Sequence, residues 1–235
     1  MRIVSWNCNG AFRKKWSILN SLHGDIYIVQ ECENPEISKD VDYQKWARNH
    51  LWIGKNSGRG LGVFCMTDSS LSHVPLPDHG LELFLPCMID DKVALLAAWT
   101  KQANSPTFKY IGQLWKWLQQ HGQFLEHGQS LLVGDLNSNA RWDVWDRWWN
   151  HSDVVRELEQ RGLKSLYHVF HGEAQGHETI PTFFHYRDCK RPYHIDYAFL
   201  SSSLLKDAAM SIGAIESWLE HSDHMPLIID IPASE

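Results

Sequence analysis

Residues 130–137 read Ser-Leu-Leu-Val-Gly-Asp-Leu-Asn, a short apolar strand that runs into two polar side chains. In an extended chain, residues two apart point to the same side, so we expect Asp135 and Asn137 to face one substrate atom. The carboxylate can orient water or accept its proton, and the amide can donate to a phosphate oxygen. An Asx turn capping the strand end would explain the same four residues, Gly134 to Asn137.

Four more stretches place polar side chains at the end of an apolar run. They are Ser5-Trp6-Asn7-Cys8-Asn9-Gly10, Gln30-Glu31, His194-Ile195-Asp196-Tyr197 and Ser222-Asp223-His224. The ends of buried strands are where a fold can direct polar groups into one cleft. The five stretches together therefore predict a hydrolytic metal site.

Oxygen-bearing side chains near the N-terminus are candidate metal ligands. Glu31 follows a five-residue strand and Gln30, and Mg2+ prefers hard oxygen donors such as its carboxylate. Asn7 and Asn9 share one side of their segment and could offer amide oxygens to a metal or a phosphate. The alternatives are a solvated glutamate at a strand end and turn chemistry around Gly10.

Asp223 and His224 are neighbours before an apolar strand, so their side chains point to opposite sides. One division of labour places Asp223 toward a metal and His224 toward the reacting phosphate. His224 then needs an acid on its other ring nitrogen, and Asp196 is the best candidate. A buried His–Asp pair without function is the alternative, and with fourteen histidines in the chain any single one is weak evidence.

Composition limits the class of protein. The 235 residues suit one domain, and 43% apolar residues suffice for a substantial core. A net charge of -6 argues against gripping duplex nucleic acid by overall basicity. Five cysteines without a C-x-x-C pair suggest reduced thiols in a cytoplasmic protein, no signal peptide precedes the first strand, and no apolar run approaches the length of a membrane span.

Many strands interleaved with a few helices predict an α+β layered sandwich. We expect helices over residues 14–22, 106–121 and from an N-cap at Ser152 to Arg161. The expected strands cover residues 2–6, 25–29, 60–66, 92–99, 130–133, 182–185, 195–200 and 225–231.

In their order along the chain, the five motifs resemble the endonuclease/exonuclease/phosphatase superfamily, in its exonuclease III-like form. The resemblance runs from Asn7 to His224. It implies one domain over residues 1–235, with a four-layer αββα sandwich of two packed, mainly antiparallel sheets flanked by helices, as in deoxyribonuclease I. It also implies hydrolysis of a phosphate ester with Mg2+, for which Mn2+ could substitute.

The resemblance also implies roles for the matched residues. Asn7 and Glu31 correspond to metal-site positions, with Asn9 beside them, and Asp223 to a metal-side carboxylate. Asp135 corresponds to the acid that positions the attacking water, and Asn137 to an amide on the scissile phosphate. Asp196 corresponds to the acid that orients the histidine, and His224 to the histidine at the phosphate.

The stretch Ala97-Ala98-Trp99-Thr100-Lys101-Gln102 departs from this pattern, because relatives carry a phosphate-binding tyrosine or histidine there. Trp99 has one N–H donor and no acceptor, and Lys101 could supply positive charge instead. We therefore hypothesise that Trp99 or Lys101 contacts the phosphate.

A tryptophan cluster follows Asn137, and its helical spacing predicts a stripe packed on the sandwich. The alternative is an aromatic platform for bases, with Arg141 and Arg147 suited to phosphates. The cluster comprises Trp142, Trp145, Trp148 and Trp149.

The expected function is a nuclease acting on DNA or RNA, with nucleic acid as partner, no membrane insertion and a monomeric state. A phosphatase or phosphodiesterase acting on a small phosphorylated molecule or lipid head group is the first alternative. An inactive binding module on the same fold is the second.

Overall fold

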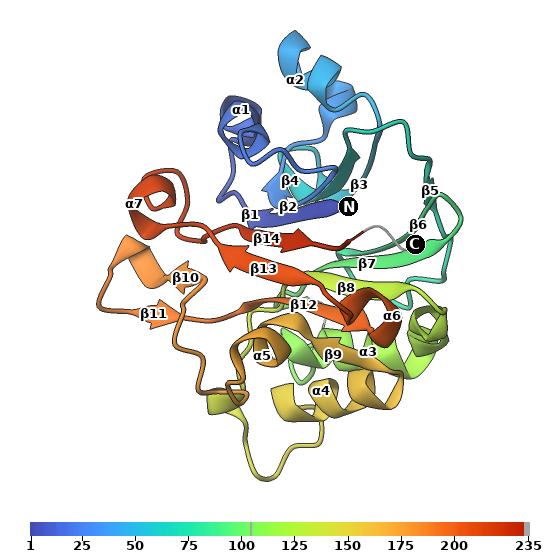
Figure 1. The fold of residues 1–235 in the computed structure, drawn as a ribbon, viewed down its shortest axis with the longest axis vertical. Coiled ribbons are helices and arrows are strands. Elements are labelled where there is room, and N and C mark those ends of the chain that lie inside the picture. The colour runs from blue at the N-terminus through green and yellow to red at the C-terminus, as the bar shows by residue number, and fades with distance from the viewer. Residues whose placement is uncertain (104, 233–235) are drawn as a thin grey trace.

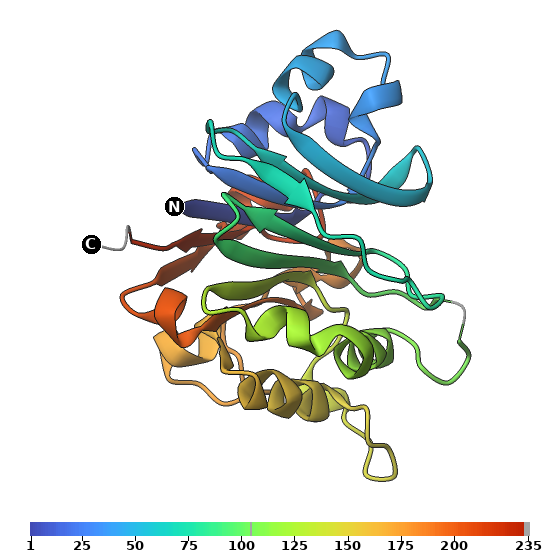
Figure 2. The same ribbon diagram turned by 90° about the vertical axis from the view of Figure 1, so that its right-hand side faces the viewer.

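The computed structural model describes residues 1–103 and 105–232 as two six-stranded sheets packed face to face (Figure 1, Figure 2). The first sheet has the spatial order β13 (Ala209–Ile212), β14 (Leu227–Asp230), β1 (Arg2–Asn7), β2 (Ile26–Cys32), β4 (Arg59–Cys65) and β3 (His50–Asn56). The second has the order β5 (Leu71–His73), β6 (Phe84–Ile89), β7 (Val93–Trp99), β8 (Ser130–Asp135), β12 (Asp196–Ser201) and β9 (Leu163–Ser165). A two-stranded ribbon joins β10 (Phe183–Phe184) to β11 (Pro192–Tyr193).

Each sheet contains one parallel pair at its centre, β1 with β2 and β7 with β8, and the other described pairings are antiparallel. The predicted α+β sandwich with mainly antiparallel sheets is therefore confirmed.

Helices cover the outer face of each sheet, which gives four layers (Figure 1). The first sheet packs on α1 (Trp16–Asn20), α2 (Val41–Trp46) and α7 (Ile215–Trp218), and the second on α3 (Ile111–His121) and α4 (His151–Gln160). Two short helices, α5 (Leu166–His171) and α6 (Ser202–Leu205), contribute Leu166, Tyr167 and Leu204 to the core between the sheets. Within the described ranges, no helix is both long and apolar enough to cross a membrane.

Strand alternation sorts the apolar side chains into these layers. In β1, Ile3 packs between the sheets while Val4 and Trp6 pack under the helices. In β8, Leu131 and Val133 face the inter-sheet core while Leu132 faces α3 and α4. These strands carry apolar side chains on both faces of the sheet, so their sequences are continuous apolar runs. Such runs are typical of strands that are buried on both faces.

Several expected boundaries were wrong. The helix over 106–121 begins at Ile111, because Tyr110 has a left-handed φ of 51° that no helix can include. The N-cap of α4 is Asn150 and not Ser152, since Asn150 and Asp153 form a reciprocal capping box. The strands β3, β5, β6, β9 and β13 were not anticipated.

The tryptophan cluster does not form a helical stripe. Residues 140–142 make one 3-10 turn (η4) and the chain then runs as a loop to Asn150. Asn139 and Asn150 accept hydrogen bonds from the backbone at either end of this loop. These side-chain bonds compete with helix formation.

Gly134 occupies a position where a side chain would not fit. Its φ is 153°, and a Cβ atom built there would lie 1.8 Å from the Ala98 carbonyl oxygen in the neighbouring strand. We expect Gly134→Ala to lower the free energy of unfolding by roughly 3 kcal/mol or more, because strain and overpacking add. Urea unfolding followed by circular dichroism measures this loss.

Gly128→Ala is the matched control, because open space surrounds Gly128. It should change the free energy of unfolding by less than about 1 kcal/mol. Equal stability of the two variants would refute the close approach of β7 and β8 at Gly134.

Candidate hydrolytic metal site

Polar residues occupy the inward-facing positions at one rim of both sheets. In β1, Asn7 lies four residues after the inward-facing Ile3, and in β2, Gln30 lies two residues after the inward-facing Ile28. An even separation along a strand places each pair on the same side. Across the core, Asp135 follows the inward Val133. Strand alternation therefore aims side chains from both sheets at one place.

Asp135 is fully buried at this rim, and its carboxylate accepts three hydrogen bonds. Asn7 Nδ2 donates to Oδ2 at 3.0 Å from the opposite sheet. Asn137 donates twice, from its backbone N–H to Oδ1 at 2.9 Å and from Nδ2 to Oδ2 at 2.8 Å. These bonds fix both carboxylate oxygens in position.

The side chains of Asn137 and Asp135 are in contact, but the backbone between them is not extended as expected. Its φ of 44° is left-handed, so the chain turns back after Leu136 and forms an Asx-type turn. The second hydrogen of its amide goes to the Thr100 carbonyl at 3.1 Å. Both amide hydrogens are thus engaged within the protein.

His224 is paired with Asp196, as the spacing predicted. Its Nδ1 lies 2.9 Å from Asp196 Oδ2, and both residues are buried. Burial would lower the pKa of His224, but the charges of Asp196 and Asp135 overcome it and raise the pKa to about 9. The imidazole is therefore a cation at neutral pH, with Nδ1 donating to Asp196.

The free ring nitrogen of His224 points toward Asp135. Nε2 lies 4.0 Å from Asp135 Oδ2, and Asp135, Asp196 and His224 bring one ligand-type atom each within 4.8 Å of one another. Burial raises the pKa of Asp135 to about 7, opposed by the positive charge of His224 and reinforced by the charge of Asp196. This cluster is suited to proton transfer near neutral pH.

Two hydroxyl groups that the sequence analysis did not single out hold this pair. Thr182 Oγ1 accepts from the backbone N–H groups of Ile195 and Asp196 at 3.0 and 3.1 Å. Ser222 Oγ donates to the Asn7 carbonyl at 2.7 Å and accepts from the His224 N–H at 3.0 Å. Ser222 stood inside a quoted motif, whereas nothing in the local sequence marked Thr182.

The oxygen donors proposed for metal lie on the first-sheet side of the rim. Glu31 sits at a β-bulge in β2 with a left-handed φ of 65°, and its Oε2 lies 2.9 Å from Arg59 Nη2. Asn7 Oδ1 accepts from the Asn9 N–H at 3.1 Å, so Asn9 turns around Asn7. Asp223 is half-buried in a bend just before His224 and not in a strand, and its Oδ1 accepts from Ser222 Oγ at 3.4 Å.

Gln30 adds an unpaired acceptor next to these donors. Its Nε2 donates to Ser5 Oγ at 3.2 Å, and its buried Oε1 has no hydrogen-bond partner among the described residues. A buried acceptor without a donor calls for a water or an ion in its vicinity. The donor set, carboxylates and amide oxygens without a thiol, fits Mg2+.

The three predicted substrate residues have different surroundings. Trp99 is only 4% exposed and packs in the core between the sheets. Lys101 is exposed, and its Nζ lies 4.6 Å from the centre of the Trp99 ring. Arg141 is exposed and its Nη2 donates to the Gly176 carbonyl at 3.4 Å.

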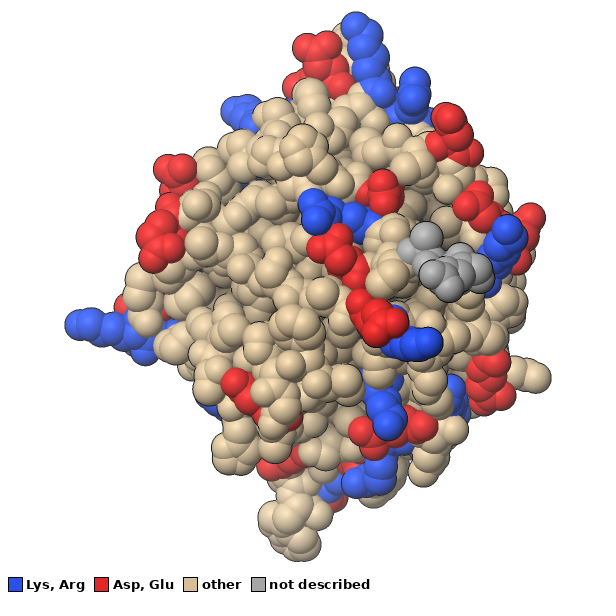
Figure 3. Space-filling model, viewed as in Figure 1, with Lys and Arg blue, Asp and Glu red and all other residues tan. Residues whose placement is uncertain are grey.

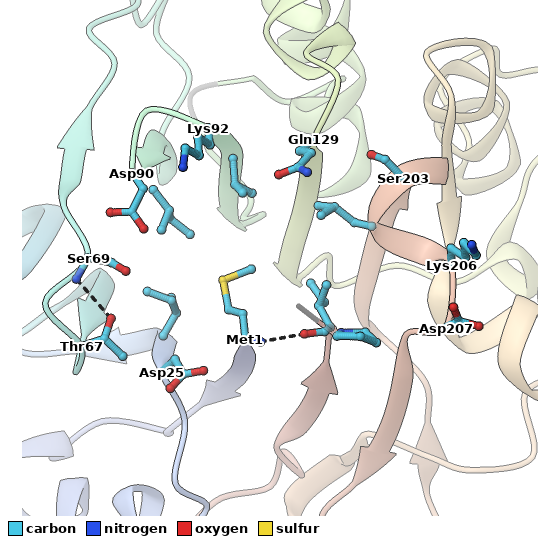
Figure 4. Close-up of a pocket in the computed structure, with 16 residues that line it drawn as sticks. Met1, Asp25, Thr67, Ser69, Asp90, Lys92, Gln129, Ser203, Lys206 and Asp207 are labelled. Atoms are coloured by element: carbon cyan, nitrogen blue, oxygen red, sulfur yellow. Dashed lines mark hydrogen bonds between the residues drawn. The ribbon is translucent and has the colours of Figure 1, made fainter. Parts of the chain in front are cut away.

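A cavity of about 880 Å³ lies at the opposite rim of the sandwich (Figure 4). Met1 and Asp25 line it at the starts of β1 and β2, and Val93 and Gln129 line it at the starts of β7 and β8. It therefore lies a full strand length from Asp135 and His224 and plays no part in their chemistry.

The His224–Asp196 pair makes a prediction about pH for the metal-free protein. Because the folded-state pKa of about 9 exceeds the ordinary value of 6.5, the pair stabilises the fold fully below pH 6.5 and loses this effect as pH rises through 9. Asp196→Asn should lower the pKa of His224 and remove this loss. NMR titration of the His224 ring and urea unfolding at pH 6 and pH 10 measure both effects.

Asp230→Asn is the control, since Asp230 pairs with Arg2 at the far end of β1. It should leave the His224 titration unchanged. A wild-type His224 that titrates at its ordinary value would contradict the pairing.

Comparisons with known proteins complete the description of the site. No protein-family model matches the chain, and no curated protein matches its sequence. Among solved structures, the 3′ phosphatase NExo from Neisseria, bound to product DNA hairpin, is 20% identical with a TM-score of 0.72 over 99% of this chain and 100% of that one. An AP endonuclease from Archaeoglobus fulgidus is 18% identical, with a TM-score of 0.70 over 99% of this chain and 100% of that one.

The catalytic domain of Xenopus laevis APE2 is 16% identical, with a TM-score of 0.68 over 98% of this chain and 91% of that one. This chain has the α+β sandwich fold of these three proteins over nearly its whole length.

Proposed function

We propose that this chain is a Mg2+-dependent hydrolase of phosphate esters that acts as a nuclease on DNA, with residues 1–235 forming one domain. The observation that carries the proposal is the buried constellation at the rim, in which Asn7 and Asp135 join across the two sheets and His224 is held charged by Asp196. The names of the proteins that share the fold support DNA as the substrate.

Asn7, Glu31 and Asp223 would hold the metal ion, with Asn9 beside them. When bound, Mg2+ neutralises charge on the phosphate and polarises a phosphoryl oxygen. We assign proton transfer to the cluster of Asp135, Asp196 and His224, because Asp196 already engages Nδ1 of the His224 ring and the other ring nitrogen lies 4.0 Å from Asp135 Oδ2. The metal and the proton-transfer groups therefore occupy neighbouring halves of the site.

The remaining residues act on the water and the phosphate. Asp135, with a pKa of about 7, orients the attacking water and accepts its proton. His224 donates a charged hydrogen bond from Nε2 to the phosphate, where negative charge develops. Asn137 reaches the phosphate only by releasing one of its two present acceptors, Thr100 or Asp135.

Outside the centre, Lys101 and Arg141 would supply positive charge to neighbouring phosphates, since both are exposed. We assign Trp99 to packing, because it is buried and its ring supports the Lys101 ammonium group.

The second candidate function is a phosphatase that removes phosphate from a DNA 3′ end with the same residues. The similarity to NExo, which is described as a 3′ phosphatase, supports it. We further propose a cytoplasmic monomer, which is supported by five free cysteines, four of them buried.

The first prediction concerns activity. Purified protein with Mg2+ or Mn2+ should cleave or dephosphorylate labelled oligonucleotides, and EDTA should abolish this. Asp135→Asn and His224→Ala should each lower the rate about 10²- to 10⁴-fold, the usual contribution of acid–base groups. Gel assays on single-stranded, duplex, abasic and 3′-phosphorylated oligonucleotides measure the loss.

Circular dichroism must show both variants folded for that comparison. Rates near wild type in either folded variant would remove the residue from its assigned role. Activity that persists in EDTA would remove the metal.

The second prediction concerns metal binding. Glu31→Gln should weaken Mn2+ binding at least tenfold by calorimetry, because an ionised carboxylate ligand is replaced by a neutral amide. Glu36→Gln is the control, an exposed glutamate five residues along the chain whose carboxylate has no role in the site. Unchanged affinity in Glu31→Gln would move the metal away from β2.

A further inference from the structure

The loop that follows Asn137 presents large aromatic side chains to solvent. Trp145 is 96% exposed and Trp148 is 64% exposed, and Trp142 and Val144 are exposed beside them. We call residues 140–150 the tryptophan loop. Exposure of several large apolar side chains on one short segment is unusual on a monomer surface and marks an interaction site.

The tryptophan loop has a specific structure, because Asn150 at its end holds Val144 and Arg147 in its middle. Asn150 Oδ1 accepts from Val144 N and from Arg147 Nε, both at 2.9 Å. Its Nδ2 donates to the carbonyls of Val144 and Arg147 at 3.0 and 2.6 Å. Asp143 accepts from the N–H groups of His151 and Ser152 at the start of α4.

Partly buried rings support the exposed tryptophans. The ring of Trp149 lies 4.6 Å from that of Phe108, and Trp148 meets Trp149 edge-on at 4.8 Å. The loop therefore turns Asn150 and, in part, Trp149 inward, while Trp142, Trp145 and Trp148 are exposed. Such preorganisation lowers the entropic cost of binding through these exposed rings.

A row of ring contacts connects the tryptophan loop with the proposed reaction centre. His224 lies 4.5 Å from Phe183, and Phe183 lies 6.2 Å from Tyr193. Tyr193 lies 5.3 Å from Trp142, the first residue of the aromatic surface. The loop therefore lies within reach of a strand whose phosphate is bound at His224.

Charge decides which kind of partner suits this surface. Two arginines and two aspartates, Arg141, Arg147, Asp143 and Asp146, give the loop no net charge. Both arginines already donate to groups of the protein. On the face shown in Figure 3, acidic and basic side chains alternate among the described residues, and the lowest part of the molecule is mostly uncharged.

An anionic membrane attracts clusters of lysine and arginine, which the tryptophan loop does not provide. Beyond the contact proposed for Arg141, phosphates gain little from the loop, because its two arginines are balanced by Asp143 and Asp146. The flat faces of unpaired bases are the remaining match, because base–aromatic stacking needs no charge and tolerates any sequence.

We propose that Trp145 and Trp148 stack on unpaired bases of the nucleic-acid strand whose phosphate lies at Asp135 and His224. The proposal rests on the nuclease function proposed above and specifies its substrate as one with a single-stranded segment beside the scissile bond. Binding through the tryptophan loop should therefore favour single strands and overhangs over blunt duplex.

The test compares Trp145→Ala and Trp145→Phe with wild type by fluorescence anisotropy on labelled single-stranded and blunt duplex oligonucleotides, with Ca2+ in place of Mg2+. Trp145→Ala should weaken single-strand binding roughly 5- to 150-fold. The Phe variant should retain most of the affinity. The salt dependence should stay unchanged, because no phosphate contact is lost.

Phe170→Ala is the matched control, an exposed aromatic side chain (51%) on α5, which Figures 1 and 2 place apart from the loop. It should bind both oligonucleotides as wild type does. Trp145→Ala should also hydrolyse bis-p-nitrophenyl phosphate at the wild-type rate, since that small diester cannot reach the loop.

The outcomes separate the two proposals. Suppose that the wild-type protein cleaves oligonucleotides, and that Trp145→Ala and Trp148→Ala bind single strands as tightly as wild type does. The stacking proposal is then overturned, and the nuclease proposal stands. The loop is a membrane contact if wild type binds neutral lipid vesicles and Trp145→Ala does not, while both bind oligonucleotides equally. That result also overturns the stacking proposal. Failure of wild type to bind or cleave any oligonucleotide overturns both proposals.

Discussion

The hydrogen bond from Asn7 to Asp135 joins the two sheets at their rim, and the rest of the site depends on it. It spans 3.0 Å between strands that are 128 residues apart in sequence, and both side chains are buried. A carboxylate placed between two sheets without donors would be costly. The bonds from Asn7 and Asn137 reduce this cost, so Asp135 can stay buried and still titrate near neutral pH.

The same strands supply both the core and the chemistry. Inward positions carry Ile3, Leu131 and Val133 at the start and middle of these strands, whereas Ser5, Asn7 and Asp135 make the inward positions toward the rim polar. Moving either strand by one residue would send the polar group under the helices and an apolar residue to the rim. The register that packs the core therefore also places the reactive groups, which explains why a site this polar can stand on an apolar sandwich.

Much of this arrangement could be predicted from sequence, and the failures have physical causes. The strand-end motifs predicted the His224–Asp196 pair, because a motif keeps residue type and strand position together. The edge strand β3 was missed because its outer residues are exposed and carry no alternating apolar signal. The tryptophan loop was mistaken for a helical stripe, since Trp142, Trp145 and Trp149 have helical spacing while the hydrogen bonds of Asn150, which sequence does not display, hold an open loop.

In the function proposed above, Asn7 would keep the metal-binding half of the site apart from the paired histidine. Its Nδ2 faces Asp135 and, beyond it, His224, whereas its Oδ1 faces the turn at Asn9 on the side of Glu31. An amide is a neutral side chain that donates at one end and accepts at the other. An aspartate at position 7 would repel Asp135, and an apolar residue would leave that carboxylate without its cross-sheet donor. The separation of proton transfer from metal binding therefore depends on an uncharged residue between them.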